Sequence, residues 1–203
     1  MAITNGYCTL DDLRAQLSVE DNADDTRMEA VITAVSRWID TEARRRFYTT
    51  QNDETRYYTA TCDEFVLTDD MISVTSVATD LDGSGSYATA WVSTDYLLSP
   101  FNASALGQPY TEIRTRRSGS KSFDPCIEAG VKVVGKFGVP ADSPWQEIVR
   151  EACLIQSARI FKRKDSPFGI AGTGEFGQLS MLKPSLDPDV KAMLAPPIRR
   201  LQV

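Results

Sequence analysis

Among the side chains of this sequence, the carboxylates could take part in the widest range of reactions. They gather at Asp11 and Asp12, across residues 20–25, and at Asp69 and Asp70. Two carboxyl groups that share a cleft can act as acid and base in hydrolysis. The first two groups, however, stand where helices are predicted to begin, and a negative charge there stabilises the helix dipole. We therefore interpret them as helix-end charges and predict no catalytic carboxylate pair.

Histidine is absent from all 203 residues, which removes the commonest general base and the commonest metal ligand. The four cysteines are scattered and form no CxxC motif, so neither a zinc site nor a redox motif is visible. We interpret them as buried free thiols. The sequence thus predicts no enzyme activity, no cofactor and no metal site. The four cysteines are Cys8, Cys62, Cys126 and Cys153.

Two short motifs suggest ligand binding but have simpler interpretations. Residues 172–177 match the GxGxxG pattern, yet a predicted helix precedes them where the dinucleotide fold needs a strand. We predict a flexible loop there. Residues 80–83 read Asp-Leu-Asp-Gly, like the start of a calcium loop, but the twelfth position is Trp91 in place of the required Glu. A hairpin turn is the favoured interpretation.

Basic clusters are the remaining candidates for binding. Those at 44–46 and 162–164 end predicted helices, where a positive charge complements the dipole. They can also contact phosphates or an acidic protein surface. The net charge of −6 disfavours autonomous DNA binding, although a nucleic-acid-binding helical protein that uses these basic helix ends is the alternative function. The candidate contact residues are Arg44, Arg45, Arg46, Arg116, Arg117, Lys162, Arg163, Lys164, Arg199 and Arg200.

Length and composition limit the kind of fold that can position these residues. A chain of 203 residues with 42% hydrophobic and 25% charged residues is typical of a single globular domain. No apolar run approaches the ~20 residues of a membrane-spanning helix. The N-terminus also lacks the pattern of a signal peptide. We expect a soluble protein of the cytoplasm that does not contact a membrane.

The periodicity of apolar residues predicts helices at both ends of the chain and strands between them. Helices are expected within residues 9–47, where Thr9 and Asp12 form a capping box ahead of a short first helix and a second helix spans about 25–47. Helices are also expected within 144–195, where residues 147–164 are apolar over more than half of the helix surface and should pack on two sides. A β-rich insertion is expected at about 50–138 and a basic tail at 196–203. The fold class is therefore α+β, mainly an α-helical bundle with a β-rich insertion in the middle, in one domain over 1–203. The predicted strands are 55–60, 64–67, 73–80, 87–93, 112–115 and 131–137.

Both ends of the chain resemble the head–tail connector (adaptor or head completion) proteins of tailed bacteriophages. The closing helix and its sequel, residues 152–169, carry the resemblance, together with the Leu-Asp-Pro-Asp-Val cap at 186–190. Residues 7–13 and 34–48 are similar to the start of the family, and residues 133–140 to its lead-in to the closing helix. Helical ends around a variable β-rich middle match the order of the family, and the resemblance covers about half of the chain.

The resemblance implies a structural virion protein without enzyme activity. Members form a ring, typically a dodecamer, under the portal, where they extend the DNA channel and provide a platform for neck or tail proteins. The implied partners are other copies of the chain, the portal protein, a downstream neck, stopper or tail protein, and phage DNA that passes without sequence-specific binding. The implied location is the head–tail junction of a virion assembled in the bacterial cytoplasm. The ten basic residues then become candidate contacts with the portal or with DNA in the channel.

Overall fold

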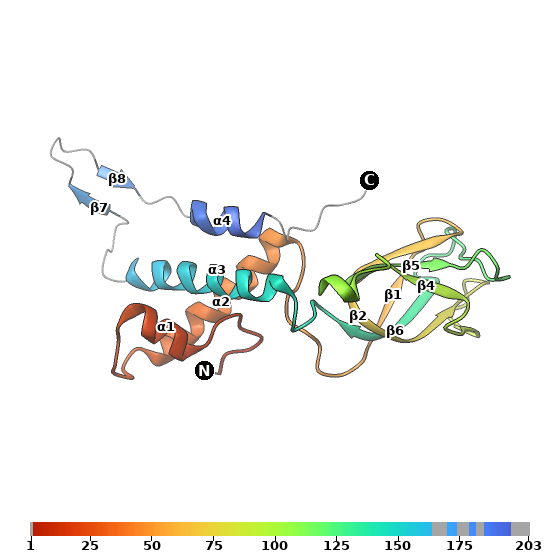
Figure 1. The fold of residues 1–203 in the computed structure, drawn as a ribbon, viewed down its shortest axis with the longest axis horizontal. Coiled ribbons are helices and arrows are strands. Elements are labelled where there is room, and N and C mark those ends of the chain that lie inside the picture. Colours follow the sequence, from red (N-terminus) through yellow and green to blue (C-terminus); the bar gives the residue numbers. More distant parts are fainter. Residues whose placement is uncertain (1, 164–169, 174–178, 182–184, 196–203) are drawn as a thin grey trace. The chain divides into compact units, whose positions relative to one another are not determined.

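The chain folds into two compact units in the computed structural model, which describes residues 2–163, 170–173, 179–181 and 185–195. The helical unit consists of Met1–Arg44 and Trp145–Val203, and the β unit of Arg45–Pro144 (Figure 1). The β unit therefore lies between two halves of the helical unit in the chain, and the backbone passes between the units twice.

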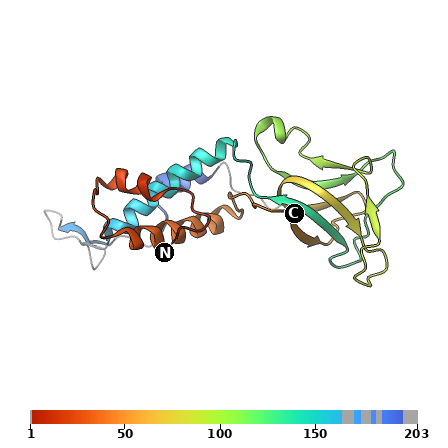
Figure 2. The same ribbon diagram turned by 90° about the horizontal axis from the view of Figure 1, so that it is seen from below.

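The helical unit contains α1 (Leu10–Leu17), α2 (Asp25–Ala43), α3 (Pro144–Lys162) and α4 (Pro188–Leu194). The end of α2 and the start of α3 lie at the same end of this unit, so the two helices are antiparallel (Figures 1 and 2). α2 buries a stripe of apolar residues at three- and four-residue steps. α3 buries a broader face, which includes Val149, Cys153 and Phe161. The α2 stripe consists of Met28, Ile32, Val35 and Ile39.

Side chains fix the ends of these helices. Thr9 and Asp12 form the predicted capping box at the start of α1. The side chain of Asp187 accepts the N–H of Asp189, as predicted from the Asp-Pro-Asp sequence, and begins α4. α2 starts at the predicted residue but ends at Ala43, before the predicted residue 47, because Arg44 adopts a left-handed conformation with φ of 54°.

The β unit is built on one antiparallel sheet. Its strand order is β1-β6-β2-β5-β4, and β3 also pairs with β2. The long strand β2 pairs with β5 along its first half and with β6 and β3 along its second, so it organises the whole sheet. The strands are β1 (Glu54–Tyr58), β2 (Phe65–Thr79), β3 (Thr89–Trp91), β4 (Tyr96–Ser99), β5 (Tyr110–Thr115) and β6 (Val131–Phe137), and a 3-10 turn, η1, spans Ser104–Leu106.

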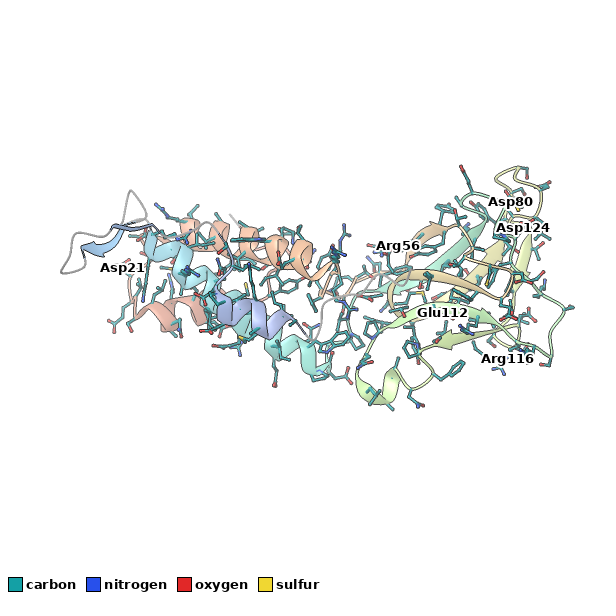
Figure 3. The ribbon with its side chains drawn as sticks, turned by 90° about the horizontal axis from the view of Figure 1, so that it is seen from above. Asp21, Arg56, Asp80, Glu112, Arg116 and Asp124 are labelled. Atoms are coloured by element: carbon teal, nitrogen blue, oxygen red, sulfur yellow. The ribbon has the colours of Figure 1, made fainter. Side chains whose placement is uncertain are left out.

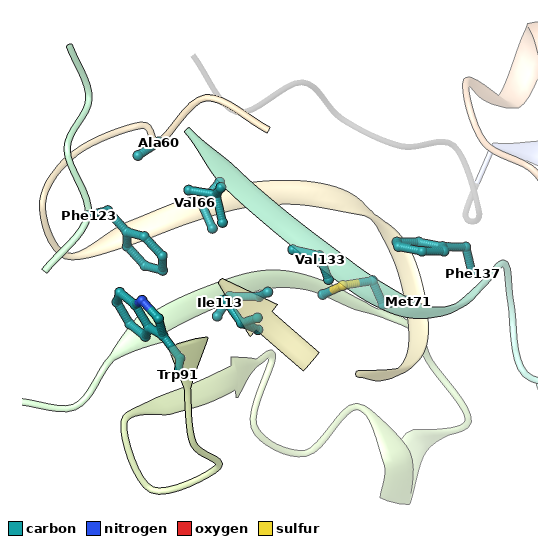
Figure 4. Close-up of a cluster of buried hydrophobic side chains, with 10 residues drawn as sticks. Ala60, Val66, Met71, Trp91, Ile113, Phe123, Val133 and Phe137 are labelled. Atoms are coloured by element: carbon teal, nitrogen blue, oxygen red, sulfur yellow. The ribbon is translucent and has the colours of Figure 1, made fainter. Parts of the chain in front are cut away.

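The core of the β unit lies inside this curved sheet (Figure 4). Trp91 stacks on Phe123 with ring centres 4.4 Å apart, and its Nε1–H donates to Thr79 Oγ1 at 3.0 Å. The indole therefore buries its apolar surface without leaving its donor unpaired. Apolar residues from β2, β5 and β6 fill the remainder of the core, namely Val66, Met71, Val77, Ile113, Val131, Val133 and Phe137.

The expectation of a mainly α-helical bundle is wrong. Residues Arg45–Pro144 form a compact unit with their own six-stranded antiparallel sheet and core, so strands are as central to the protein as helices. The sequence predicted two short strands, 64–67 and 73–80, where the structure has the single strand β2. In the structure Asp70 is only 4% exposed and lies beside Arg45, which allows an acidic residue inside one continuous strand.

Two smaller expectations also need correction. Strand β4 was not predicted, because its four residues follow a turn without a clear alternating pattern. The glycine-rich segment after α3 was predicted to be a loop, but Ile170–Thr173 form β7, which pairs with β8 (Leu179–Met181) in a separate two-stranded sheet. β7 includes the first glycine of the GxGxxG match, and the rest of that match from residue 174 lies outside the described residues.

Candidate functional site

The basic candidates in the helical unit lie at its two opposite ends. Arg44 is exposed directly after α2, and Lys162 is the exposed last residue of α3, followed by Arg163. Because α2 and α3 are antiparallel and each has 19 residues, the two positions are separated by about 28 Å, the length of one such helix. The structure does not bring them together. Three further candidates, Lys164, Arg199 and Arg200, lie outside the described residues.

Arg45 and Arg46 open the β unit and have different surroundings. Arg45 Nε lies 3.5 Å from Asp70 Oδ2, and the two side chains are 7% and 4% exposed. A buried charge needs a partner, so this ion pair is part of the interior of the β unit. Arg46 is exposed, and its guanidinium lies 6.0 Å from the ring centre of Tyr48. Of this pair, only Arg46 faces solvent.

Arg116 and Arg117 are exposed in the loop that follows β5. The N–H of Arg116 donates to the carbonyl of Asp95 at 3.0 Å, which connects this loop to the turn before β4. Figure 3 shows Arg116 toward the same end of the β unit as Asp80 and Asp124. This end of the β unit therefore carries charges of both signs.

The calcium-like sequence at residues 80–83 forms the predicted turn. The Asp80 carboxylate accepts the N–H groups of Asp82, Gly83 and Gly85 at 3.2, 3.1 and 2.6 Å. Backbone donors thus occupy the oxygens that would otherwise coordinate a cation. Throughout the described ranges, no group of three or more His, Cys, Asp or Glu side chains is placed to hold a metal ion.

The chain enters and leaves the β unit through two segments that are hydrogen-bonded to each other. Thr50 donates its N–H to the carbonyl of Phe137 at 2.9 Å, and the N–H of Phe137 donates to Thr50 Oγ1 at 3.0 Å. Gly138 follows with φ of 117°, and a Cβ there would lie 2.1 Å from the carbonyl oxygen of Tyr48. Its N–H donates to the carbonyl of Asp70 at 2.9 Å. These contacts hold together the entering segment, with Tyr48 and Thr50, and the leaving segment, with Phe137 and Gly138. We call these two segments the base of the β unit.

A polar seam joins β1 to β2, which are consecutive in the chain but do not pair as strands in the fully described residues 45–144. Arg56 Nη1 donates to Asp69 Oδ2 at 2.8 Å, and the Tyr58 hydroxyl donates to the same oxygen at 3.1 Å. The Arg56 guanidinium also lies 3.9 Å from the ring centre of Phe137. Burial raises the pKa of Tyr58 above its usual value. The seam is therefore structural, and no spacing of residues in the sequence predicted it.

The carboxylates near the helix starts are used in ion pairs. Arg150 Nη2 lies 2.6 Å from Asp12 Oδ1, and Arg14 Nη2 lies 2.5 Å from Asp25 Oδ2. Hydrogen bonds from Arg150, and then from the backbone and side chain of Thr9, lower the pKa of Asp12 to about 2. Each of these two carboxylates has a basic partner, so neither is paired with the other as a hydrolytic site would require.

The cysteines only partly match the prediction of buried thiols. All four are free, and Cys8 and Cys153 are buried, whereas Cys62 is half-buried and Cys126 is exposed.

Exposed apolar residues occur on the β unit, where Phe101 and Leu106 lie in the β4–β5 connection and are 64% and 58% exposed. Among the helices described, none has the length and apolar character needed to span a membrane.

Comparison with known proteins identifies the fold. No protein-family model and no curated protein sequence matches the chain. A chain in the neck of an empty gene transfer agent (GTA) particle, computed with C6 symmetry, matches with a TM-score of 0.60 and 17% identity, over 100% of this chain and 94% of that chain. A chain in the neck of a native GTA particle, computed with C12 symmetry, and one in the native GTA virion each match with a TM-score of 0.57 and 14% identity over the same shares. Over its whole length, the chain has the fold of proteins found in the necks of these phage-like particles.

Proposed function

We propose that this protein is a head–tail connector, or adaptor, in the neck of a tailed phage-like particle, with a structural role and no enzyme activity. The observation that carries the proposal is the fold match, which extends over the full length of the chain and 94% of the matching neck proteins. The family resemblance of residues 7–13, 34–48, 133–140, 152–169 and 186–190 supports the same conclusion independently. In this proposal the helical unit and the β unit act together as one connector domain.

The proposed connector is a ring of identical subunits, and a dodecamer is the expected form. One of the matching necks was computed with C12 symmetry, which supports this number. A closed ring needs each subunit to present two different surfaces, one to each neighbour. Exposed apolar side chains at such surfaces are buried on assembly. Phe101 and Leu106 in the β4–β5 connection are therefore candidate contacts between subunits.

The proposed partners are the portal protein above the ring and a neck, stopper or tail protein below it. Exposed basic residues at opposite ends of the helical unit, Arg44 and Lys162, can serve different partners. Arg46, Arg116 and Arg117 are the corresponding exposed candidates on the β unit. The net charge of −6 favours DNA that slides through the ring, because a predominantly acidic wall repels phosphates. Assembly takes place in the bacterial cytoplasm, and the final location is the head–tail junction.

The decisive experiment is electron microscopy of particles from cells that produce a tagged copy of the chain, with gold particles marking the tag. The proposal predicts label at one vertex of the head, where the tail joins. The control is the same tag on an unrelated cytoplasmic protein, which should not enter particles. Particles without label, with the tagged chain left soluble, would contradict the proposal.

A second experiment separates this proposal from the nucleic-acid-binding alternative. In the structure the basic residues are dispersed, with Arg45 buried against Asp70 and Arg44 about one helix length (~28 Å) from Lys162. We expect the isolated chain to show no measurable affinity for duplex DNA at physiological salt. Affinity that falls steeply as salt rises would indicate several phosphate contacts and would favour the alternative.

A further inference from the structure

Two cysteine thiols from distant parts of the chain are in contact inside the helical unit. Cys8 Sγ lies 3.4 Å from Cys153 Sγ, although the residues are 145 positions apart. Cys8 precedes α1 and is 4% exposed, and Cys153 lies in the middle of α3 and is completely buried. The other two cysteines, Cys62 and Cys126, belong to the β unit. The fold therefore selects one pair of thiols out of the four.

Polar groups surround this pair and hold it in place. Ser36 Oγ on α2 and Ser157 Oγ on α3 lie 3.5 and 3.8 Å from Cys153 Sγ. Ser36 Oγ also accepts the N–H of Tyr7 at 3.1 Å, next to Cys8 in the chain. The Tyr7 hydroxyl in turn donates to Asp40 on α2. The segment before α1 is thus fixed on α2 with its thiol directed at α3.

The same surroundings shift the pKa values of the two thiols in opposite directions. A hydrogen bond from the Cys8 S–H lowers the pKa of Cys153, despite its burial. The pKa of Cys8 is raised, because its proton is held in that bond. The thiolate is the form that attacks disulfides, and a lowered pKa increases the fraction of thiolate. Cys153 is the attacking group of the pair.

We infer that Cys8 and Cys153 form an intramolecular disulfide when the protein meets a low-molecular-weight disulfide such as oxidised glutathione. The sulfur atoms need to approach from 3.4 Å to a bond length of about 2.05 Å. Side-chain rotation with a small shift of the segment before α1 can supply this movement, since Cys8 lies outside the regular helices. The bond would join that segment covalently to α3.

The reaction proceeds by two exchanges in which atoms and electrons balance. The Cys153 thiolate attacks one sulfur of oxidised glutathione, forms a mixed disulfide and releases one glutathione thiolate, which takes up a proton. Cys8 then loses its proton, attacks the Cys153 sulfur and releases the second glutathione. The two protein thiols are oxidised by two electrons in total, and the glutathione disulfide is reduced to two thiols. Both protein sulfurs are buried, so local opening of the segment before α1 sets the rate.

The consequence is a covalent loop that contains α1, α2 and the whole β unit. A cross-link over so long a stretch restricts the unfolded chain and stabilises the folded one. Cytoplasmic thiols remain reduced, whereas proteins outside the cell meet oxidising conditions. The bond would therefore form when the folded chain meets an oxidant. The inference concerns the isolated chain and does not depend on the proposed function.

The test uses a chain with Cys62→Ser and Cys126→Ser, so that Cys8 and Cys153 are the remaining thiols. After incubation with oxidised glutathione, thiols are titrated in denaturant and peptides are mapped. We expect both thiols to disappear, a linked peptide pair containing Cys8 and Cys153, and a rise in Tm of about 5 °C or more. Adding Cys8→Ser should abolish the linked pair and the rise in Tm.

Three results would overturn the inference. Both thiols could remain titratable after prolonged oxidation, glutathione could remain attached to either cysteine, or the linked peptides could come from two different chains. Circular dichroism of each reduced variant shows whether it is folded. If Cys8→Ser does not fold, Cys153→Ser is the replacement control. Tyr7→Phe gives a second readout, because loss of its hydroxyl bond to Asp40 should accelerate oxidation without changing its product.

Discussion

The helical unit and the β unit complete their hydrogen bonds in different ways. In the helical unit each helix satisfies its own backbone, and local side chains such as Thr9 and Asp187 cap the ends. In the β unit the bonds join strands that are distant in sequence, and β2 pairs with three other strands. Where β1 and β2 are not paired as strands, Arg56 and Asp69 bridge them. The helical unit therefore depends on local signals, and the β unit on specific long-range contacts.

The largest expected effect comes from the base of the β unit. In Gly138→Ala, the new Cβ would lie 2.1 Å from the Tyr48 carbonyl oxygen, at a φ of 117° that side chains rarely adopt. Backbone strain and overpacking together should destabilise the β unit by about 4 kcal/mol. Denaturation followed by Trp91 fluorescence, in a background with Trp38→Phe and Trp145→Phe, measures this effect.

A second glycine with a positive φ shows the cost of backbone conformation without a close contact. Gly83 also has a positive φ, 71°, but nothing lies within 4 Å of a Cβ built on it. Gly83→Ala should therefore cost only about 1 kcal/mol, from backbone conformation alone. Equal losses at both positions would show that the close approach at Tyr48 contributes nothing to the stability of the β unit.

These contrasts explain how much of the fold the sequence could predict. Helix ends depend on residues within one turn, so the starts of α1 and α2 and the cap of α4 were predicted at the observed positions. Strand β6 was predicted correctly because its burial alternates over its seven residues. The continuity of β2 could not be predicted, since Asp70 is tolerated in a strand only because Arg45 lies beside it.

The candidate contact residues could likewise be only partly predicted from the sequence. The sequence located the basic clusters, but their neighbours decide which residues reach solvent. Arg44 and Arg46 are exposed, whereas Arg45 between them is buried against a residue 25 positions later. Likewise, the spacing of the cysteines gave no indication that Cys8 and Cys153 lie in contact. Long-range pairs of this kind are properties of the fold and not of local sequence.

The second prediction tests whether each unit depends on its own core. Ile32 in α2 and Ile113 in β5 are both completely buried. Truncation of either to Ala should cost about 3 kcal/mol, through lost burial and the cavity that remains. We expect Ile113→Ala to lower the stability reported by Trp91, and Ile32→Ala to lower that reported by helical circular dichroism.

Comparing Trp91 fluorescence with helical circular dichroism shows whether the two units unfold separately. Because the β-unit core consists only of residues from that unit, each substitution should shift the reporter of its own unit more than the other. Ile113→Val is the conservative control and should cost about 1 kcal/mol. Equal shifts of both reporters for both alanine variants would contradict the division, because they would show one cooperative transition.

The third prediction concerns the seam between β1 and β2. Arg56→Met keeps an unbranched side chain over Phe137 but removes the ion pairs to Asp69 and Glu54 and the cation–π contact. We expect a loss of about 1.5 kcal/mol in the β unit, measured by urea denaturation. Glu54→Gln is the control and should cost about 0.3 kcal/mol, since the Glu54 side chain is 48% exposed. A loss with Glu54→Gln as large as that with Arg56→Met would show that the contacts to Asp69 and Phe137 are not important.

The smallest expected effect lies in the helical unit, at the Asp12–Arg150 pair. The folded pKa of Asp12, about 2, is below its ordinary value of 3.8, so its stabilising contribution is present above pH 3.8 and is lost as pH falls toward 2. Asp12→Asn keeps the size of the side chain and lacks this titration. It should be about 0.5 kcal/mol less stable than the wild type at pH 6, a value typical of an exposed ion pair. This difference in stability should disappear by pH 2.

Asp11→Asn, at an exposed neighbour in the same helix turn, is the control for general charge effects. A difference that stays constant from pH 6 to pH 2 would show that Asp12 stabilises α1 by capping geometry alone, without its charge.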